Sequence, residues 1–239
     1  MSITHQEPPT ARRRETRTRL LDAATEVFAE SGVQGASVEQ VCARAGFTRG
    51  AFYSNFSTKE ELFLAVLERE FDRRASEVEA TIAELTPTLQ QLRGLIDPDQ
   101  AAEYITRFIT PEKGQNHWFL LETEFSLLAM RDPEVAPGYV ELLTRATANF
   151  AALVETAITA AGRRFIFPAD RTTEIIDGMC ERAVRNTMAG GDDQSGGIDA
   201  LPQQISALLF VVTEPIPSED PETETETETE TETENPVTP

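Results

Sequence analysis

Three helix start signals follow one another in the stretch SVEQVCARAGFTRGAFYSNFSTKEEL, residues 37–62, and they constrain the fold more than any other feature of the chain. Two of them have the spacing of a capping box, in which a Ser or Thr side chain bonds the amide three residues on while a Gln or Glu reaches back. The signals are Ser37 with Gln40, Thr58 with Glu61, and the single cap Thr48 between them. Since each cap begins a new helix, this stretch predicts short helices joined by tight turns.

Glycine-containing stops separate these starts, because glycine readily adopts the left-handed conformation that ends helices. The stops are Ser31-Gly32 and Ala45-Gly46. Before the first stop, apolar residues recur at helical spacing and form one stripe that can be buried. The expected helices span residues 11–30, 37–45, 49–55 and 58 to about 84.

The rest of the chain also has the periodicity of helices, and Pro or Gly interrupts it. The interruptions fall at Asp97-Pro98, Asp132-Pro133, Gly162, Pro168 and Gly190-Gly191. We find no stretch with the alternation of a strand, and RFIF at 164–167 is too short to count. The sequence therefore predicts an all-α fold.

Both ends of the chain have the composition of disordered segments. Residues 1–10 contain Pro8 and Pro9 and show no periodicity. Residues 213–239 consist largely of Glu-Thr repeats, which cannot bury apolar surface. We expect a disordered arm over 1–10 and a disordered acidic tail over 213–239.

Charge is distributed unevenly along the chain. The whole sequence has 41 acidic and 21 basic residues, a net charge of −20. Residues 1–59 nevertheless contain eight basic and six acidic residues, whereas 214–239 contain ten acidic residues and no basic one. A mildly basic N-terminal part in an acidic protein is consistent with an anionic partner for that part.

The expected third helix has two different sides when its residues are placed at about 100° intervals. Phe52 and Phe56 fall on one side, one turn apart, and must pack against the first two helices. The other side carries small residues, Gly50, Ala51 and Ser54, with Arg49, Tyr53 and Asn55 at its margins. A helix with such a side can approach another surface closely, as a recognition helix approaches the major groove of DNA. The helix-turn-helix arrangement has this order of short helix, glycine-containing turn and short helix.

The quoted stretch resembles the DNA-binding domain of tetracycline-repressor (TetR) type transcriptional regulators. The matching positions are Ser37, Val41-Cys42, Ala45-Gly46-Phe47-Thr48-Arg49-Gly50, Tyr53, Phe56 and Lys59-Glu60. The end of the first helix, AATEVFAESG, matches too, so the resemblance covers about residues 15–67. The departures are Cys42 for Ala, Phe47 for Val, and Asn55 where His is frequent. The resemblance implies a helix-turn-helix DNA-binding domain over 11–57 and a helical ligand-binding and dimerisation domain over 58–212.

The resemblance also implies roles for individual residues. Thr48, Tyr53 and Lys59 would bind phosphates, while Arg49, Gly50, Ser54 and Asn55 would meet base edges. Arginines between Arg12 and Arg19 would add attraction that does not depend on DNA sequence. The full set expected at the DNA is Ser37, Thr48, Arg49, Gly50, Ala51, Tyr53, Ser54, Asn55 and Lys59. The alternative is that these residues only cap, pack and solvate a plain three-helix bundle, and for Phe52 and Phe56 a core position is expected.

For the second domain the resemblance implies a homodimer whose C-terminal helices, 170–189 and 198–212, form a four-helix bundle. Its seam would contain Ile175, Ile176, Met179 and Val184 on one helix and Ile205, Leu208, Leu209 and Val212 on the other, with Gly178 allowing close approach. The alternative is that these helices pack only within one chain.

A ligand pocket is expected among the middle helices. The candidates are Tyr104, Phe108, Trp118, Phe119, Glu122, Phe125, Tyr139 and Phe150, with His117, Asn116 and Met130 as further possibilities. Such a set suits a small, mainly apolar effector with few polar groups. The alternative for most of these residues is a place in the core.

Other function classes find little support in the sequence. The chain has two His, no Glu-x-x-His pair, no phosphate-binding glycine loop and no G-x-S-x-G motif, so no enzyme activity, metal site or cofactor is expected. Two distant Cys and the lack of a long apolar run favour a cytoplasmic protein without a membrane segment. The prediction is a dimeric, sequence-specific regulator that binds a double-stranded DNA operator, a repressor released by an effector. The alternative is a helical dimeric adaptor that binds proteins and no operator.

Overall fold

The computed structural model describes residues 11–109, 115–190 and 197–217. In chain order its elements are α1 (Ala11–Gly35), α2 (Val38–Ala45), α3 (Arg49–Tyr53), α4 (Lys59–Gln91), α5 (Pro98–Ile109), α6 (Gln115–Arg131), α7 (Ala136–Ala160), β1 (Arg163–Phe165), α8 (Ala169–Met188), the 3-10 turn η1 (Ile198–Ala200), α9 (Leu201–Val212) and β2 (Thr213–Pro215). The expected arm over 1–10 and most of the expected tail, residues 218–239, lie outside the described residues.

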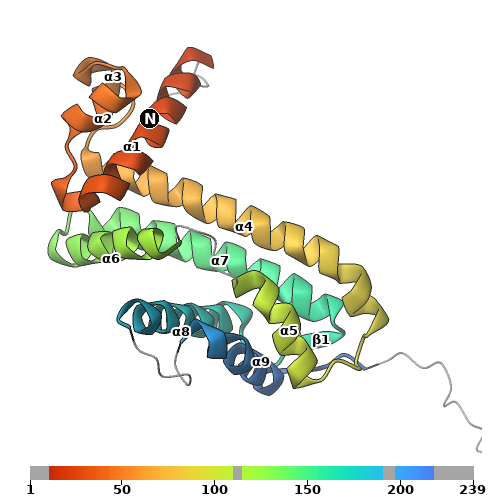
Figure 1. Ribbon diagram of the computed structural model, residues 1–239. Coiled ribbons are helices and arrows are strands. Elements are labelled where there is room, and N and C mark those ends of the chain that lie inside the picture. Colours follow the sequence, from red (N-terminus) through yellow and green to blue (C-terminus); the bar gives the residue numbers. More distant parts are fainter. Residues whose placement is uncertain (1–10, 110–114, 191–196, 218–239) are drawn as a thin grey trace, which may run out of the picture.

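The molecule is elongated, with the small bundle of α1, α2 and α3 at one end (Figure 1). The long helix α4 begins beside this bundle and runs along the rest of the molecule next to α7. Helices α8 and α9 lie on the other side of α7, and α5 crosses near the end that is remote from α1. Helix α4 therefore belongs to both halves of the protein.

The all-α expectation is confirmed, with one small correction. Strands β1 and β2 form an antiparallel ribbon in which Arg163 pairs with Pro215 and Phe165 with Thr213. The RFIF segment was discounted as too short, and the tail was expected to begin at residue 213. Arg163 stabilises the ribbon, since its guanidinium donates to the hydroxyl and the carbonyl of Thr213, each at 2.8 Å. Short strands of this kind form because the chain ends of α7 and α9 meet, which no local pattern reveals.

Helix boundaries differ from expectation in three places. Gly32 has the expected positive φ of 69°, but one more helical turn follows it, so α1 ends at Gly35. Helix α3 ends at Tyr53 instead of residue 55. Helix α4 continues through Pro87 to Gln91. The proline removes one backbone bond on an exposed face, where water can take its place.

A continuous core joins the N-terminal bundle to α4, α6 and α7. Its centre is a row of aromatic rings, in which Phe28 meets Phe63 edge-on at 4.9 Å between ring centroids and Phe63 stacks on Phe125 at 4.6 Å. Phe125 then meets Tyr139 edge-on at 5.5 Å. Phe125 and Tyr139 are 0% and 9% exposed, so they are core residues and not the pocket residues that the sequence suggested.

A second, smaller core lies between α5, α8 and α9. Ala183, Leu201 and Ile205 are buried there. Ile205 is a member of the expected dimer seam, and the partly buried residues around this core include three more members, Ile176, Met179 and Leu209. These four residues contact residues of their own chain, because α9 lies against α5 as well as α8.

Candidate nucleic-acid interface and ligand cavity

The predicted caps position α2 and α3. The Ser37 hydroxyl accepts from the Gln40 amide, and the Gln40 side chain accepts from the Ser37 amide at 2.8 Å. Gly46 ends α2 in the left-handed conformation, with φ 69° and ψ 33°. Thr48 then caps α3 by accepting from the Ala51 amide. The helix-turn-helix geometry thus follows from local capping hydrogen bonds that can be predicted from the sequence.

Helix α3 presents the two sides expected of it. Phe52 and Phe56 are fully buried against the bundle, whereas Gly50 and Ser54 are exposed, and Tyr53 is 49% exposed. A Cβ placed on Gly50 would meet nothing nearer than the Thr48 hydroxyl, 3.8 Å away. The side of α3 around Gly50 is therefore open to a partner.

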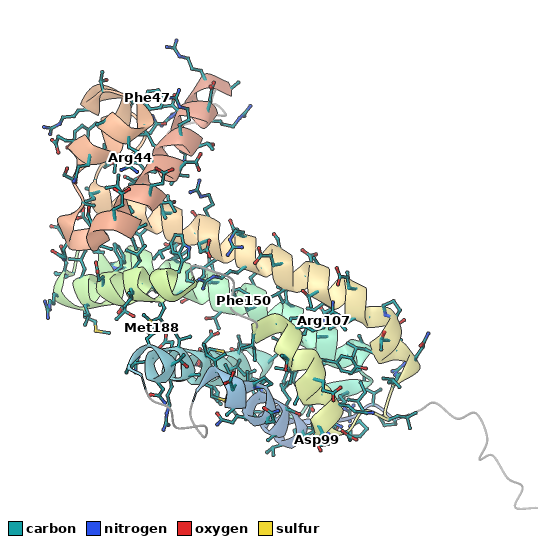
Figure 2. All side chains as sticks on the ribbon, viewed as in Figure 1. Arg44, Phe47, Asp99, Arg107, Phe150 and Met188 are labelled. Atoms are coloured by element: carbon teal, nitrogen blue, oxygen red, sulfur yellow. The ribbon has the colours of Figure 1, made fainter. Side chains whose placement is uncertain are left out.

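Arginines of α1 bind the carboxyl ends of α2 and α3. Arg13 donates to the carbonyl of Ser54 at 3.2 Å, and Arg17 donates to the carbonyl of Asn55 while its guanidinium lies 4.3 Å from the centre of the Phe56 ring. Arg19 donates to the carbonyl of Ala45 at 2.8 Å. Cations are favourable at helix carboxyl ends, where carbonyls lack partners. These arginines were expected only to attract DNA, and the structure shows that they also stabilise the bundle. Figure 2 shows this bundle, with Arg44 and Phe47 labelled.

Two of the residues expected at base edges turn back toward their own helix. The Ser54 hydroxyl and the Asn55 side-chain amide both donate to the carbonyl of Ala51 at 2.8 Å. Asn55 is half-buried, and within the described part of the chain its Oδ1 is a buried atom without a hydrogen-bond partner. The Asn55 side chain must rotate before it can reach a base, so in this conformation it is not available for a base contact.

Arg49 and Lys59 are also engaged within the protein. Arg49 pairs with Glu39 of α2 at 2.7 Å and donates weakly to the Tyr53 hydroxyl at 3.4 Å. The Lys59 ammonium donates to the carbonyls of Val33 and Ala36 at 2.9 and 3.0 Å. An ammonium group has three N–H bonds, so one remains for an outside acceptor. Lys59 thus closes the end of α1 in addition to any contact with DNA.

A cavity of about 810 Å³ lies between α4, α5, α6, α7 and α8. Of the predicted pocket residues, Phe108, Phe119, Glu122 and Phe150 line it; Phe150 and Arg107 are labelled in Figure 2. Tyr104 and Trp118 are half-buried elsewhere, and Met130 is exposed on α6. The side chains of Asn116 and His117 lie outside the described residues.

The sequence missed the contributions of α4 and α8 to this cavity. Phe71 and Arg74 of α4 and Asp177, Cys180 and Glu181 of α8 also line it. The helix over 170–189 was expected to serve the dimer seam, and no pocket residue was expected on the fourth helix. The available signal was a polar and acidic face on α8, which a dimer seam alone does not require.

Burial changes the acidity of the groups at the cavity. It raises the pKa of Glu122 to about 7, although nearby Arg74 opposes the change, and it raises the pKa of Asp177 to about 6, helped by the charges of Glu181 and Glu174. Burial also raises the pKa of the Cys180 thiol to about 12, so that this thiol is neutral and unreactive at pH 7. The cavity therefore contains carboxyl groups whose ionised form lacks adequate solvation.

Helix α6 connects the cavity to the N-terminal bundle. Glu122 faces the cavity, and two residues further on Glu124 accepts a hydrogen bond of 2.7 Å from the amide of Val33 at the end of α1. A Cβ on Gly32 would lie 2.8 Å from the same carboxylate. Helix α6 therefore contacts both the cavity and the end of α1.

Within the described ranges, no group of three or more His, Cys, Asp or Glu side chains could hold a metal ion. Across those same residues, no helix is both long and apolar enough to cross a membrane.

The N-terminal domain matches a known family. Residues 20–66 match the family model described as bacterial regulatory proteins, tetR family. The chain is 39% identical over 85 residues to the HTH-type transcriptional activator FasR of Mycolicibacterium smegmatis, a match that covers 36% of this chain and 39% of that protein. It is 49% identical over 57 residues to the HTH-type transcriptional regulator TtgW of Pseudomonas putida, covering 24% and 42%. The chain thus spans about two fifths of the length of these curated relatives.

The whole fold has solved counterparts. A TetR-family transcriptional regulator from Rhodococcus sp. superposes with a TM-score of 0.62 at 16% identity, covering 83% of this chain and 98% of that one. At this identity the likeness concerns the fold alone, and the family assignment comes from the N-terminal match. Together with the open face of α3, the match over residues 20–66 identifies the N-terminal part of the chain as a DNA-binding domain of the tetR family of bacterial regulatory proteins.

Proposed function

We propose that this regulator acts as a cytoplasmic homodimer that binds a roughly two-fold symmetric DNA operator and represses transcription until a small effector enters the cavity and releases it. The observation that carries the proposal is the open side of α3, where Gly50 leaves room for close approach and Tyr53 stands exposed beside it. One α3 would enter the major groove in each half-site.

The contacts of individual residues refine their proposed roles. Tyr53 and Thr48 would bind phosphates, and Arg49 would exchange Glu39 for a base edge or a phosphate. Lys59 would use its one remaining N–H bond on a phosphate, so a change at Lys59 affects stability as well as DNA affinity. Tyr53 therefore offers the cleaner test of phosphate binding.

We expect Tyr53→Phe to weaken binding to the operator and to unrelated duplex DNA by the same factor, about three- to tenfold. The change removes only a hydroxyl, and one hydrogen bond of this kind contributes roughly 0.5–1.5 kcal/mol. Fluorescence anisotropy with both duplexes measures the two affinities. Tyr104→Phe, the same change on α5, is the control and should alter neither. A loss confined to the operator would instead assign Tyr53 to a base contact.

Salt dependence separates this proposal from a protein-binding adaptor. Binding to DNA releases counterions, so the logarithm of the binding constant must fall linearly with the logarithm of salt concentration. Duplexes taken from the DNA upstream of the protein's own gene serve as operator candidates in this binding assay. The adaptor alternative has no reason to bind duplex DNA or to show this slope.

The dimer is proposed for the faces of α8 and α9 that remain exposed. Ile175, an expected seam residue of α8, is 45% exposed. Val211 of α9, which the expected seam did not include, is 74% exposed, whereas Ile176, Met179, Ile205 and Leu209 of that seam already pack within the chain. Two-fold association would cover these side chains in the way that homodimer interfaces cover apolar surface. Sedimentation equilibrium at micromolar concentration measures the assembly, and a monomer at the concentrations that bind operator would contradict it.

The regulator could repress or activate transcription. The curated relatives include FasR, printed as an activator, and AcnR of Corynebacterium glutamicum, printed as a repressor. For this chain we propose repression that the effector relieves. A ligand between α4, α6 and α8 would move α6 and disturb the end of α1 that supports α2 and α3, and operator binding would weaken. A reporter gene behind the operator, with and without the regulator, tests the direction.

A further inference from the structure

We propose that the effector is a lipophilic organic cation, a positively charged centre on an aromatic or bulky aliphatic body. The inference rests on the proposed role of the cavity as the effector site and names the class of molecule that the site takes. It differs from the expected mainly apolar effector in adding a positively charged centre.

The cavity wall is acidic. Carboxylates outnumber basic groups there by five to two, the basic groups being Arg74 and Arg107. Both arginines are already paired, Arg74 with Glu70 at 3.0 Å and Arg107 with Glu84 at 2.7 Å. Their positive charges are therefore partly neutralised by acids outside the cavity lining, and the wall presents excess negative charge.

Two of the carboxylates stand out because they lack partners. The three others that line the cavity are paired with neighbouring arginines, listed as Glu77 with Arg73, Glu174 with Arg171 and Glu181 with Arg185. No hydrogen bond or ion pair within the described ranges engages the carboxylate of Glu122 or Asp177. A carboxylate that is withdrawn from water without a partner is costly. A cation between α6 and α8 would remove that cost for both.

Aromatic rings complete the site. Phe71, Phe108, Phe119 and Phe150 come from four different helices and line the same cavity. An aromatic ring attracts a cation over its face by about 0.5–2 kcal/mol and also packs against an apolar body. Carboxylates and rings together select an organic cation. A metal ion is not favoured, because no group of three or more ligating side chains occurs among the described residues.

Two probes of similar shape test the class of ligand. Tetraphenylphosphonium is a permanent lipophilic cation, and triphenylphosphine oxide is its neutral counterpart. We expect isothermal titration calorimetry on the full chain to show binding of the cation at least tenfold tighter than binding of the neutral probe. Equal affinities, or no binding of the cation, would overturn the proposal.

Charge-removing variants of nearly unchanged shape assign the effect to residues. We expect Glu122→Gln and Asp177→Asn each to weaken the cation about tenfold and to leave the neutral probe unchanged. Glu174→Gln is the matched control, because Arg171 already neutralises Glu174 at 2.9 Å; it should change cation affinity less than twofold. If the Glu122→Gln and Asp177→Asn variants bind the cation as tightly as the unmodified protein does, these carboxylates do not contribute to the site.

The affinity for tetraphenylphosphonium should also rise with pH between 5 and 8. The probe does not titrate, and the pKa of Glu122 at about 7 and of Asp177 at about 6 means that both lose protons in this range. The ionised form binds the cation, so binding strengthens by roughly tenfold to a hundredfold as they ionise. Other groups facing them are Glu77, Glu174, Glu181, Arg74, Arg107, Cys180 and Tyr139. The doubly neutral variant Glu122→Gln with Asp177→Asn should show a much flatter profile, and an equally steep one would contradict the assignment.

The operator separates failure of this inference from failure of the proposed function. A cation that binds in the cavity and leaves operator affinity unchanged would reject effector-controlled release while the ligand class stands. A neutral probe that binds more tightly than the cation and releases the operator would reject the ligand class while the proposed function stands.

Discussion

Gly50→Leu is expected to abolish operator binding, with a loss of at least a hundredfold, while the protein folds as before. The Gly50 position faces open space, with only the Thr48 hydroxyl within 4 Å of an added Cβ. A leucine there meets nothing in the protein but occupies the space that a base pair needs in the major groove. Gly50 has no positive φ, so the backbone tolerates a side chain, and a helical glycine costs up to about 1 kcal/mol relative to alanine.

Three measurements decide the outcome for Gly50. Circular dichroism and thermal melting should match those of the unmodified protein, while anisotropy with the operator shows the loss. Gly50→Ala should bind with intermediate affinity because it adds one methyl group. Ala152→Leu adds the same kind of bulk to an exposed position of α7 and should leave operator affinity unchanged. Unfolding of Gly50→Leu would mean that Gly50 packs inside the bundle and that the orientation of α3 is wrong.

The accuracy of the sequence interpretation depended on the range of the interactions. The caps at Ser37, Thr48 and Thr58 and the stop at Gly46 involve residues at most five apart, and each begins or ends its helix as predicted. The capping box expected at Thr58 is only half formed, because the Glu61 carboxylate accepts from the Ser57 amide instead of the Thr58 amide. The buried side of α3 was equally local, since Phe52 and Phe56 are one turn apart on a short helix. The family resemblance rested on this same local stretch, which is why it covered the N-terminal domain and not the rest.

The cavity could not be predicted in the same way. Phe125 and Phe119 are both aromatic residues of α6, yet Phe125 stacks on Phe63 in the core and Phe119 lines the cavity. Which of them faces inward depends on how α6 packs against α4 and α7, and helical periodicity does not give that packing. Asp177 and Glu181 form an acidic face on α8, but only the fold shows that this face lines a cavity together with α4 and α6.

Long-range polar contacts were equally hidden. Lys59 matches a family position, and the sequence suggested a phosphate contact for it. The carbonyls of Val33 and Ala36 that it binds are more than twenty residues earlier in the chain. The contact of Glu124 with Val33 spans a still greater separation and joins the two domains. These contacts make the end of α1 the place where the domains are tied together.

A double-mutant cycle of Gly32 and Glu124, at the contact between Glu124 and Val33, should give strongly non-additive losses in the free energy of unfolding. Gly32→Ala introduces a Cβ 2.8 Å from the Glu124 carboxylate and places a side chain at φ 69° and ψ 175°, a region that only glycine occupies readily. The carboxylate must then leave the Val33 amide, which costs roughly 1.5–3 kcal/mol beyond the backbone strain. In a Glu124→Ala background that bond is already absent, so Gly32→Ala should cost less there by about 1–2 kcal/mol.

Denaturant unfolding of the four proteins of the cycle measures these free energies. Gly94→Ala is the control for backbone strain, since Gly94 also has a positive φ, 77°, but an added Cβ would meet nothing within 4 Å. The same Glu124→Ala variant tests function: an effector should release the operator less efficiently, because α6 no longer holds the Val33 amide at the end of α1. Coupling between sites in proteins is typically about 1–3 kcal/mol, so loss of one direct link should be measurable. Additive costs in the cycle, together with unchanged release, would show that Glu124 only fills space and that the domains communicate through the aromatic row of Phe28, Phe63 and Phe125 instead.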